Sequence, residues 1–448
     1  MDRLRKLFAP RERYQPIDEF APDAVEGQSE HHQNQPVSRF SRVEYGVFFL
    51  LGVSMLWAWN MFLAAAPYFA QRFESDDWAE SHFQSSILSV STVTNLAALF
   101  ILAKLQKNAS YPRRILLSLL ITITVFTLLA IASLTMQDVT VGTYFGFLMV
   151  MVFGASLATG INQNGTFAYV SGFGREEYTQ AIMAGQGVAG VLPCIAQIAS
   201  VLAVPEKKDG ALPLPQTSST SAFIYFTTAV AVASLTLVAF LYHLRRQSGM
   251  EDKSADESDP MLPREEDQKP VNVSLLTLSK KLRWIGSSVF LCFAVTMVFP
   301  VFTAKIDSVN DHNNSSRLFQ PAIFIPVAFL FWNTGDLIGR TIVLIPRLSL
   351  AHHPRILFLF TVSRLVFIPL YLLCNIRDRG AILDSDFFYL FIVQLLFGVS
   401  NGYLGSICMM SAAQWVSEDE REASGAFMSL MLVGGLAAGS LLSFLVAN

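Results

Sequence analysis

Charged residues are scarce in this chain of 448 residues. Asp, Glu, Lys and Arg make up 15% of the sequence and hydrophobic residues 52%, whereas soluble domains carry about 25% charged residues. The hydrophobic residues occur in uninterrupted runs of about 20, which at roughly 1.5 Å per residue can cross a hydrocarbon core of about 30 Å as a helix. The composition excludes an ordinary soluble domain and predicts an all-α polytopic membrane protein surrounded by lipid.

A strong charge of either sign is also missing. The formal net charge is -3, which is too close to zero to indicate nucleic acid or another strongly charged partner. No obligate protein partner is indicated either. The zinc-hydrolase motif His-Glu-x-x-His is absent, and His352 and His353 stand together in a basic loop. We therefore do not expect an enzyme.

Cysteine is rare, and an N-terminal signal sequence is not apparent. No pair of the four cysteines has metal-ligand spacing, and each lies in a hydrophobic run: Cys194, Cys292, Cys374 and Cys408. We expect no disulfide framework, no metal and no cofactor. Residues 1–42 are polar and lack an early hydrophobic core, so targeting to the membrane is expected to depend on the first spanning helix.

The hydrophobic runs predict eleven spanning helices in two groups. The predicted spans are 43–70, 83–105, 114–136, 143–171, 179–203, 221–244, 284–305, 321–345, 355–376, 386–413 and 423–447. The predicted domains are a disordered cytoplasmic N-tail (1–42), a six-helix bundle (43–244), a charged cytoplasmic linker (245–283) and a five-helix bundle (284–448). Lys and Arg cluster in the N-tail and in the linker, which favours a cytoplasmic N-terminus.

Two opposite charges lie deep in the eighth span. A charge at the bilayer centre costs a few kcal/mol, so such residues normally pair and face the protein interior. Asp336 and Arg340 are four residues apart, which places them on one face of a helix, close enough for an ion pair. The pair either holds two helices in register or lines a permeation path, where it could bind an uncharged substrate rich in hydroxyls. Arg364 in the ninth span is interpreted as mainly structural.

Polar and aromatic residues also interrupt the first and fourth spans. Trp57, Trp59 and Asn60 lie well inside the first span, where an indole ring could stack on a planar base and an amide could pair with a substrate or a backbone. The run Asn162 to Asn164, followed by Tyr169, makes the fourth span unusually polar. Such a patch must face protein or water rather than lipid.

Five motifs, in this order, resemble those of the equilibrative nucleoside transporter family. They are Trp59-Asn60, the run Gly185 to Gly187, NTGDLIGR from Asn333, SRLVFIPLYLLCN in the ninth span and SNGYLGS in the tenth. The similarity extends from about residue 45 to the C-terminus. The short polar loop 71–82 and the modest segment 245–283 look more like the fungal vacuolar and lysosomal branch than the plasma-membrane branch.

The resemblance implies a two-bundle fold similar to the major facilitator fold and facilitated movement of purine and pyrimidine nucleosides. It also implies that Tyr169 lies at the midplane cavity, where many members carry a Gln that binds the base. The candidate substrate-binding residues are Leu56, Trp59, Asn60, Leu63, Tyr169, Asn333, Asp336 and Arg340. Transport of nucleobases stays open.

Two further questions stay open at this point. Asp336 could carry a proton in a coupled symporter, although the adjacent Arg340 favours the ionised carboxylate and argues against it. The segment Glu257 to Leu262 resembles an acidic dileucine sorting signal, and Asn313 and Asn314 are glycosylation sequons. We therefore expect a vacuolar or lysosomal membrane, with the plasma membrane as the alternative.

Overall fold

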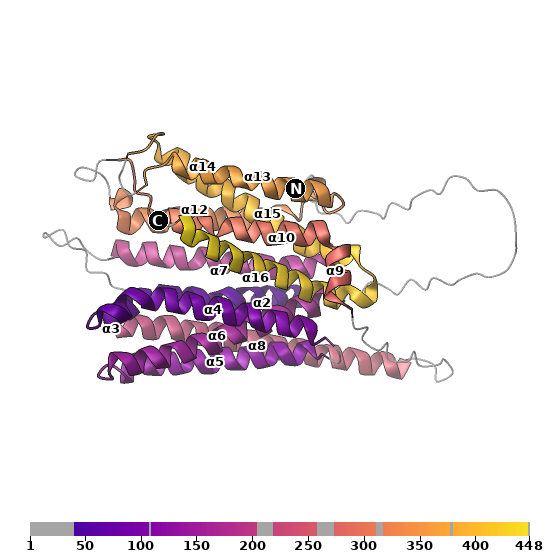
Figure 1. Cartoon of the computed structure of the whole chain (residues 1–448). Coiled ribbons are helices and arrows are strands. Elements are labelled where there is room, and N and C mark those ends of the chain that lie inside the picture. Colours follow the sequence, from indigo (N-terminus) through magenta and orange to yellow (C-terminus); the bar gives the residue numbers. More distant parts are fainter. Residues whose placement is uncertain are drawn as a thin grey trace, which may run out of the picture.

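The computed structural model describes residues 40–106, 109–203, 218–257, 273–310, 317–376 and 380–446. Among these residues, eleven helical segments are long and apolar enough to cross a membrane, and the fold is all-α apart from one isolated bridge between Ile306 and Ile376. The predicted fold class is thereby confirmed. The helices of the second half, orange to yellow in Figure 1, lie on one side of the indigo to magenta helices of the first half.

The first half contains six spans. They are formed by α2 (Arg42–Ala64) with α3 (Ala66–Phe73), α4 (Asp77–Lys104), α5 (Tyr111–Thr135), α6 (Val141–Gly172), α7 (Glu176–Ala203) and α8 (Ser219–Glu257). Pro67 stands at the start of α3, where the missing backbone N–H is tolerated. Helix α4 begins earlier than the predicted span because the Asp76 side chain caps it, accepting from the backbone N–H groups of Trp78 and Ala79.

The second half contains five spans, of which three are irregular. They are formed by α10 (Arg283–Thr296) with α11 (Val298–Thr303), α12 (Pro321–Ile342), α13 (Pro354–Ser363) with the 3-10 turn η4 (Arg364–Val366) and α14 (Phe367–Leu372), the π-helix η5 (Phe388–Leu395) with α15 (Leu396–Ser411), and α16 (Arg421–Val446). The other short 3-10 turns flank or end these helices: η2 (Arg317–Phe319), η3 (Pro346–Leu348), η6 (Ala412–Trp415) and η7 (Glu418–Glu420).

The predicted linker 245–283 is helical at both of its ends. Helix α8 continues to Glu257, and a short helix α9 (Leu275–Lys281) precedes α10. The Ser274 side chain caps α9 by accepting from the Leu276 N–H at 3.3 Å, and Leu278 of α9 is buried. The Ser274 cap and the buried Leu278 side chain stabilise helix α9. Composition alone predicted a polar linker here.

Contacts between helices repeat from one half to the other. In the first half α2 packs against α7 and α4 against α6, which pairs spans one with five and two with four. In the second half α10 packs against α16 and α12 against α15, which pairs spans seven with eleven and eight with ten. The same pairs recur six spans later. Two parallel repeats of this kind build the halves of major facilitator transporters.

Glycines allow the closest of these helix pairs to approach. Gly335 and Gly339 of α12 face Gly398 and Gly402 of α15, and a Cβ atom added to Gly402 would lie only 1.8 Å from the backbone oxygen of Asp336. Small residues at an interface let two membrane helices come close enough for backbone contact. The α12–α15 contact thus fixes the height at which Asp336 faces α15.

We predict that Gly402→Ala destabilises the protein, because the added methyl group overlaps the α12 backbone and overpacking of this kind costs about 1 to 3 kcal/mol. Gly146→Ala in α6 is the matched control, since nothing lies within 4 Å of the added Cβ. Thermal unfolding of the purified variants in detergent measures the difference. Equal unfolding temperatures for the two variants would contradict the close approach of α12 and α15.

Candidate functional site

The predicted ion pair forms on α12. Arg340 Nε donates to Asp336 Oδ2 at 2.6 Å, and both residues are 4% exposed. One helical turn separates the two residues, so the pair needs no other element to bring it together. The two charges neutralise each other inside the protein, where an unpaired charge would be strongly disfavoured.

The pair also joins the two halves of the molecule. Arg340 Nη1 donates to the backbone oxygen of Met183 at 3.0 Å and to Gln186 Oε1 at 3.2 Å, both on α7. The Gln180 side chain of α7 in turn donates to the backbone oxygen of Arg340 at 3.3 Å. Helices α7 and α12 belong to different halves, so the buried pair lies at a contact between the halves.

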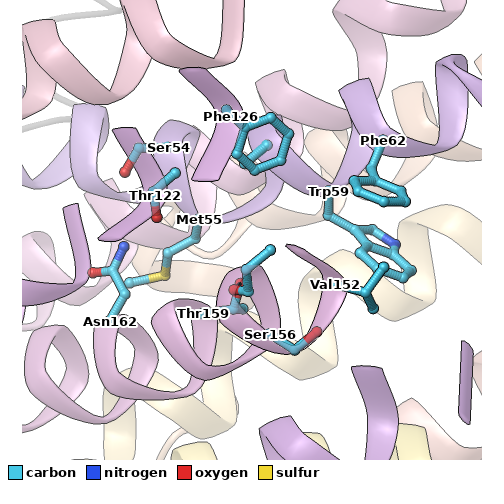
Figure 2. A pocket seen from close by; sticks show the side chains of 12 residues that line it. Ser54, Met55, Trp59, Phe62, Thr122, Phe126, Val152, Ser156, Thr159 and Asn162 are labelled. Carbon is cyan, nitrogen blue, oxygen red and sulfur yellow. Dashed lines mark hydrogen bonds between the residues drawn. The ribbon is translucent and has the colours of Figure 1, made fainter. Parts of the chain in front are cut away.

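A small cavity opens beside the first span. Figure 2 shows Trp59 and Phe62 on one side of it and Met55 and Asn162 on the other. Its full lining, from α2, α5 and α6, comprises Ser54, Met55, Ala58, Trp59, Phe62, Thr122, Phe126, Val152, Ala155, Ser156, Thr159 and Asn162. The volume is about 20 Å³, enough for a single water molecule. Sites for drug-sized ligands measure about 300 to 1,000 Å³, so a larger substrate would need this region to widen.

Among the predicted site residues of α2, only Trp59 lines this cavity. Leu56 is half-buried and Leu63 is 52% exposed. Asn60 uses its side-chain amide to donate to the backbone oxygen of Ala189 on α7, at 2.7 Å. In this conformation Asn60 therefore ties α2 to α7, and the structure does not bring the whole predicted α2 face to the cavity.

Asn333 lies on the same helix as the ion pair and faces α7. Its Nδ2 donates to the backbone oxygen of Phe329 at 2.9 Å and approaches Cys194 Sγ at 3.5 Å. A Cβ atom on Gly190 of α7 would be 2.4 Å from Asn333 Oδ1. Asn333 thus packs against α7 at Gly190, where any larger residue would overlap its side chain. This contact between the halves lies about two helical turns from Arg340.

The expected midplane position of Tyr169 is wrong. Tyr169 lies in the last turn of α6, and its hydroxyl is 3.0 Å from His243 Nε2 and donates to Gln247 Oε1 at 2.6 Å, both on α8. The ring packs edge-on against Phe173 and Phe240. Helix α6 continues only to Gly172, so a side chain at 169 is near its end rather than halfway along it.

The polar patch of α6 is buried, as its composition requires. Asn162 lines the cavity and accepts from Thr166 Oγ1 at 2.9 Å, and Asn164 Oδ1 accepts from Arg114 Nη1 of α5 at 2.5 Å. Among the described residues, Gln163 Oε1 and Asn164 Nδ2 are buried without a hydrogen-bond partner. Of this patch, Asn162 alone supplies a polar group to the cavity lining, a role that the sequence interpretation gave to Tyr169.

The pentapeptide Gly398 to Gly402 has the form Gly-x-Ser-x-Gly, which marks the nucleophile in many hydrolases. Here Ser400 lies within helix α15 rather than on a strand-to-helix turn. Its hydroxyl accepts from Arg364 Nε at 3.1 Å and donates to the backbone oxygen of Phe397 at 2.8 Å. No histidine contacts it among the described residues, so the motif match is not a catalytic site.

The fold is shared with solved membrane transporters. The chain superposes with a TM-score of 0.57 on the major facilitator superfamily transporter FucP in the outward conformation, at 14% identity, over 90% of this chain and 91% of that one. It superposes with a TM-score of 0.55 on the human organic anion transporter MFSD10, at 15% identity, over 91% of this chain and 93% of that one. The chain thus has the fold of the major facilitator transporters.

The sequence comparisons then give the family. Residues 147–448 match the family model described as nucleoside transporter. The chain is 30% identical to the nucleoside transporter FUN26 of Saccharomyces cerevisiae, over 91% of this chain and 84% of that protein. It is 29% identical to human equilibrative nucleoside transporter 1, over 92% of this chain and 98% of that protein. The chain belongs to the nucleoside transporter family, and the resemblance stated from its motifs is confirmed.

We predict that Asp336→Asn and Arg340→Ala each reduce the initial rate of uridine uptake at least about tenfold. Removing one partner leaves the other charge buried and unpaired, which costs about 3 to 5 kcal/mol in comparable pairs. Uptake of labelled uridine into proteoliposomes containing equal amounts of folded protein measures the effect. Normal uptake by the neutral double variant Asp336→Asn/Arg340→Gln would show that the pair is purely structural.

Proposed function

We propose that this protein moves purine and pyrimidine nucleosides down their concentration gradient by alternating access. The observation that carries the proposal is the buried Asp336–Arg340 pair at the contact between the two halves. A nucleoside is uncharged and rich in hydroxyls, so a carboxylate acceptor beside a guanidinium donor can bind its ribose without a net charge to balance. The names of the relatives, among them human equilibrative nucleoside transporter 1, support this substrate class.

Trp59 is the proposed contact for the base. Its indole ring lines the cavity and lies parallel to Phe62, with 6.3 Å between ring centroids and 10° between ring planes. Stacking of a base on an aromatic side chain tolerates both purines and pyrimidines because every base has a π-face. Leu56, Asn60, Leu63 and Asn333 stay proposed contacts, which the two halves would bring to the substrate in another conformation. Transport of free nucleobases is a further part of this proposal.

Alternating access is supported by one closely packed end of the molecule. Where α6 ends and α16 begins, a Cβ atom on Gly425 would lie 2.2 Å from the backbone oxygen of Phe167, and one on Gly172 would lie 3.1 Å from Glu422 Cγ. Gly174 has φ of +62°, and its Cα faces the Arg421 guanidinium. We propose that this contact closes one side of the path and must separate for the substrate to leave there.

Asp336 is proposed to act as a fixed acceptor rather than as a proton carrier. One of its carboxylate oxygens accepts from Arg340 and the other from Asn401 Nδ2 at 2.7 Å. Both carboxylate oxygens thus already serve as hydrogen-bond acceptors for fixed donors. The proposed mechanism is therefore a uniport, with proton symport as the alternative.

For the membrane, we propose a cytoplasmic N-terminus and a vacuolar or lysosomal location. The basic N-tail and linker support the orientation. Helices α3 and α4 are joined by only Glu74 to Asp76, a short connection consistent with the organelle branch. Of the segment Glu257 to Leu262 that resembles a sorting signal, all but Glu257 lies outside the described residues, as do the sequons at Asn313 and Asn314. Imaging a tagged protein tests the location, and label at the cell surface would contradict it.

Purified protein in proteoliposomes tests the transport proposal directly. We expect saturable uptake of labelled uridine and adenosine that stops when the internal and external concentrations are equal. An imposed pH gradient should leave this final ratio at unity. Accumulation above the external concentration, driven by an inward proton gradient, would establish symport instead, and no uptake of any nucleoside would refute the proposed function.

We predict that Trp59→Ala weakens uridine binding more than Trp59→Phe does. Stacking of a base on an aromatic ring is worth roughly 1 to 3 kcal/mol by alanine substitution, and the phenyl ring keeps part of that surface. Equilibrium binding of labelled uridine to the purified variants measures the difference. If both variants fold and bind uridine equally weakly, Trp59 acts through packing of α2 rather than through the base.

We predict that Gly425→Ala lowers the maximal rate of uridine transport by favouring separation of α6 and α16. Overpacking of about 1 to 3 kcal/mol shifts a two-state equilibrium by roughly 5- to 150-fold. Gly434→Ala is the matched control on the same helix, because its Cβ would make an ordinary contact of 3.4 Å with the Phe290 ring. Equal maximal rates for the two variants would remove this contact from the transport cycle.

A further inference from the structure

The Asp336 carboxylate has a second neighbour on another helix. Asn401 of α15 donates from Nδ2 to Asp336 Oδ1 at 2.7 Å, and both residues are buried, at 1% and 4% exposure. The short Asn side chain reaches α12 because the neighbouring Gly402 lets the two backbones touch. Asp336 is therefore held on both of its oxygens, by Arg340 from its own helix and by Asn401 from α15.

The orientation of the Asn401 amide follows from the groups behind it. Its Oδ1 accepts from Thr296 Oγ1 at 2.6 Å and from Arg364 Nη2 at 3.2 Å. A guanidinium carries donors only, so the amide atom that faces Arg364 must be the acceptor oxygen. The Asn401 NH₂ group then has to face Asp336, because a flipped amide would turn its donors toward the Arg364 guanidinium.

Arg364 is fixed in turn by neutral acceptors. It is 1% exposed and donates from Nη1 to the backbone oxygen of Cys292 at 2.6 Å and from Nη2 to Thr296 Oγ1 at 3.2 Å. Its guanidinium also lies 4.7 Å from the centroid of the Phe397 ring. Within the described part of the chain Arg364 forms no ion pair, and Asn401 connects its charge to Asp336. A single carboxylate thus lies between two buried guanidinium groups, those of Arg340 and Arg364.

We propose that Asn401 is a positioning residue for transport: locked by Thr296 and Arg364, it holds the Asp336 carboxylate in the orientation that binds the substrate. This inference rests on the proposed function, because it assigns Asp336 a substrate contact. A carboxylate offers about four lone-pair positions. Two of them are used by Arg340 and Asn401, and the remaining ones are then aimed at a fixed point where a ribose hydroxyl can bind.

Asn401→Asp separates this role from a purely structural one. The change keeps the size of the side chain and gives Arg364 the counter-charge that it lacks, so a structural role should be served as well or better. Asn401→Asp also replaces the NH₂ donor that faces Asp336 by a carboxylate oxygen in about the same place. This second negative charge repels the Asp336 carboxylate. We expect a normally folded protein whose KM for uridine rises at least about tenfold, since small displacements of a binding group carry large costs.

Ser406→Ala on the same helix is the matched control, because the buried Ser406 hydroxyl has no hydrogen-bond partner among the described residues. We expect its KM and its unfolding temperature to match those of the wild type. An Asn401→Asp variant with wild-type KM overturns the proposal. A variant that unfolds at a clearly lower temperature with unchanged KM overturns it as well, since that result assigns Asn401 to stability alone.

A double-mutant cycle covers the case in which the single variant loses all uptake. In the Asp336→Asn background there is no carboxylate to orient, so Asn401→Asp should change residual uridine binding by less than about twofold. Fully additive losses contradict the coupling between the two residues. Failure of the wild type to transport uridine would instead refute the proposed function, which keeps the two failures distinguishable.

Discussion

A guanidinium group inside a membrane protein cannot be left without partners, and the second half of this chain is organised around two of them. Arg340 and Arg364 are both buried, and one carboxylate, Asp336, lies between them. Satisfying the donors of Arg364 occupies Ser400, Thr296 and the backbone of Cys292, which come from α15 and α10. The charges therefore dictate which helices of the second half must touch, and at what depth.

Glycine makes those contacts geometrically possible. Between α12 and α15, and again between α2 and α7, a Cβ atom at the contact would overlap a backbone oxygen of the partner helix, as at Gly402 and Gly185. Short side chains such as Asn401 can then bridge two helices directly. Helices α7 and α12 also lie close together, so Arg340 reaches Met183 and Gln186 on α7. The charged network therefore extends to the other half of the molecule. A movement between the halves has to break or remake these bonds.

Hydropathy and helical spacing predicted much of this arrangement. The eleven spans follow from hydrophobic runs, and the Asp336–Arg340 pair follows from a separation of four residues. The contact of Asn401 with Asp336 was not predictable, because it joins residues 65 positions apart through a helix crossing that no local pattern encodes. The repeated pairing of helices was hidden for the same reason. Tyr169 was misplaced because its position within the span was transferred from the family rather than counted from the end of α6.

We propose that the charged network is part of the transport path, with the base near Trp59 and the ribose at Asp336. A map of the purified protein in lipid nanodiscs at saturating uridine, determined by cryo-electron microscopy, measures this directly. The account predicts uridine between the two halves, with a ribose hydroxyl within hydrogen-bonding distance of the Asp336 carboxylate and the base against the Trp59 ring. Uridine bound elsewhere, with Asp336 contacted only by Arg340 and Asn401, would contradict it.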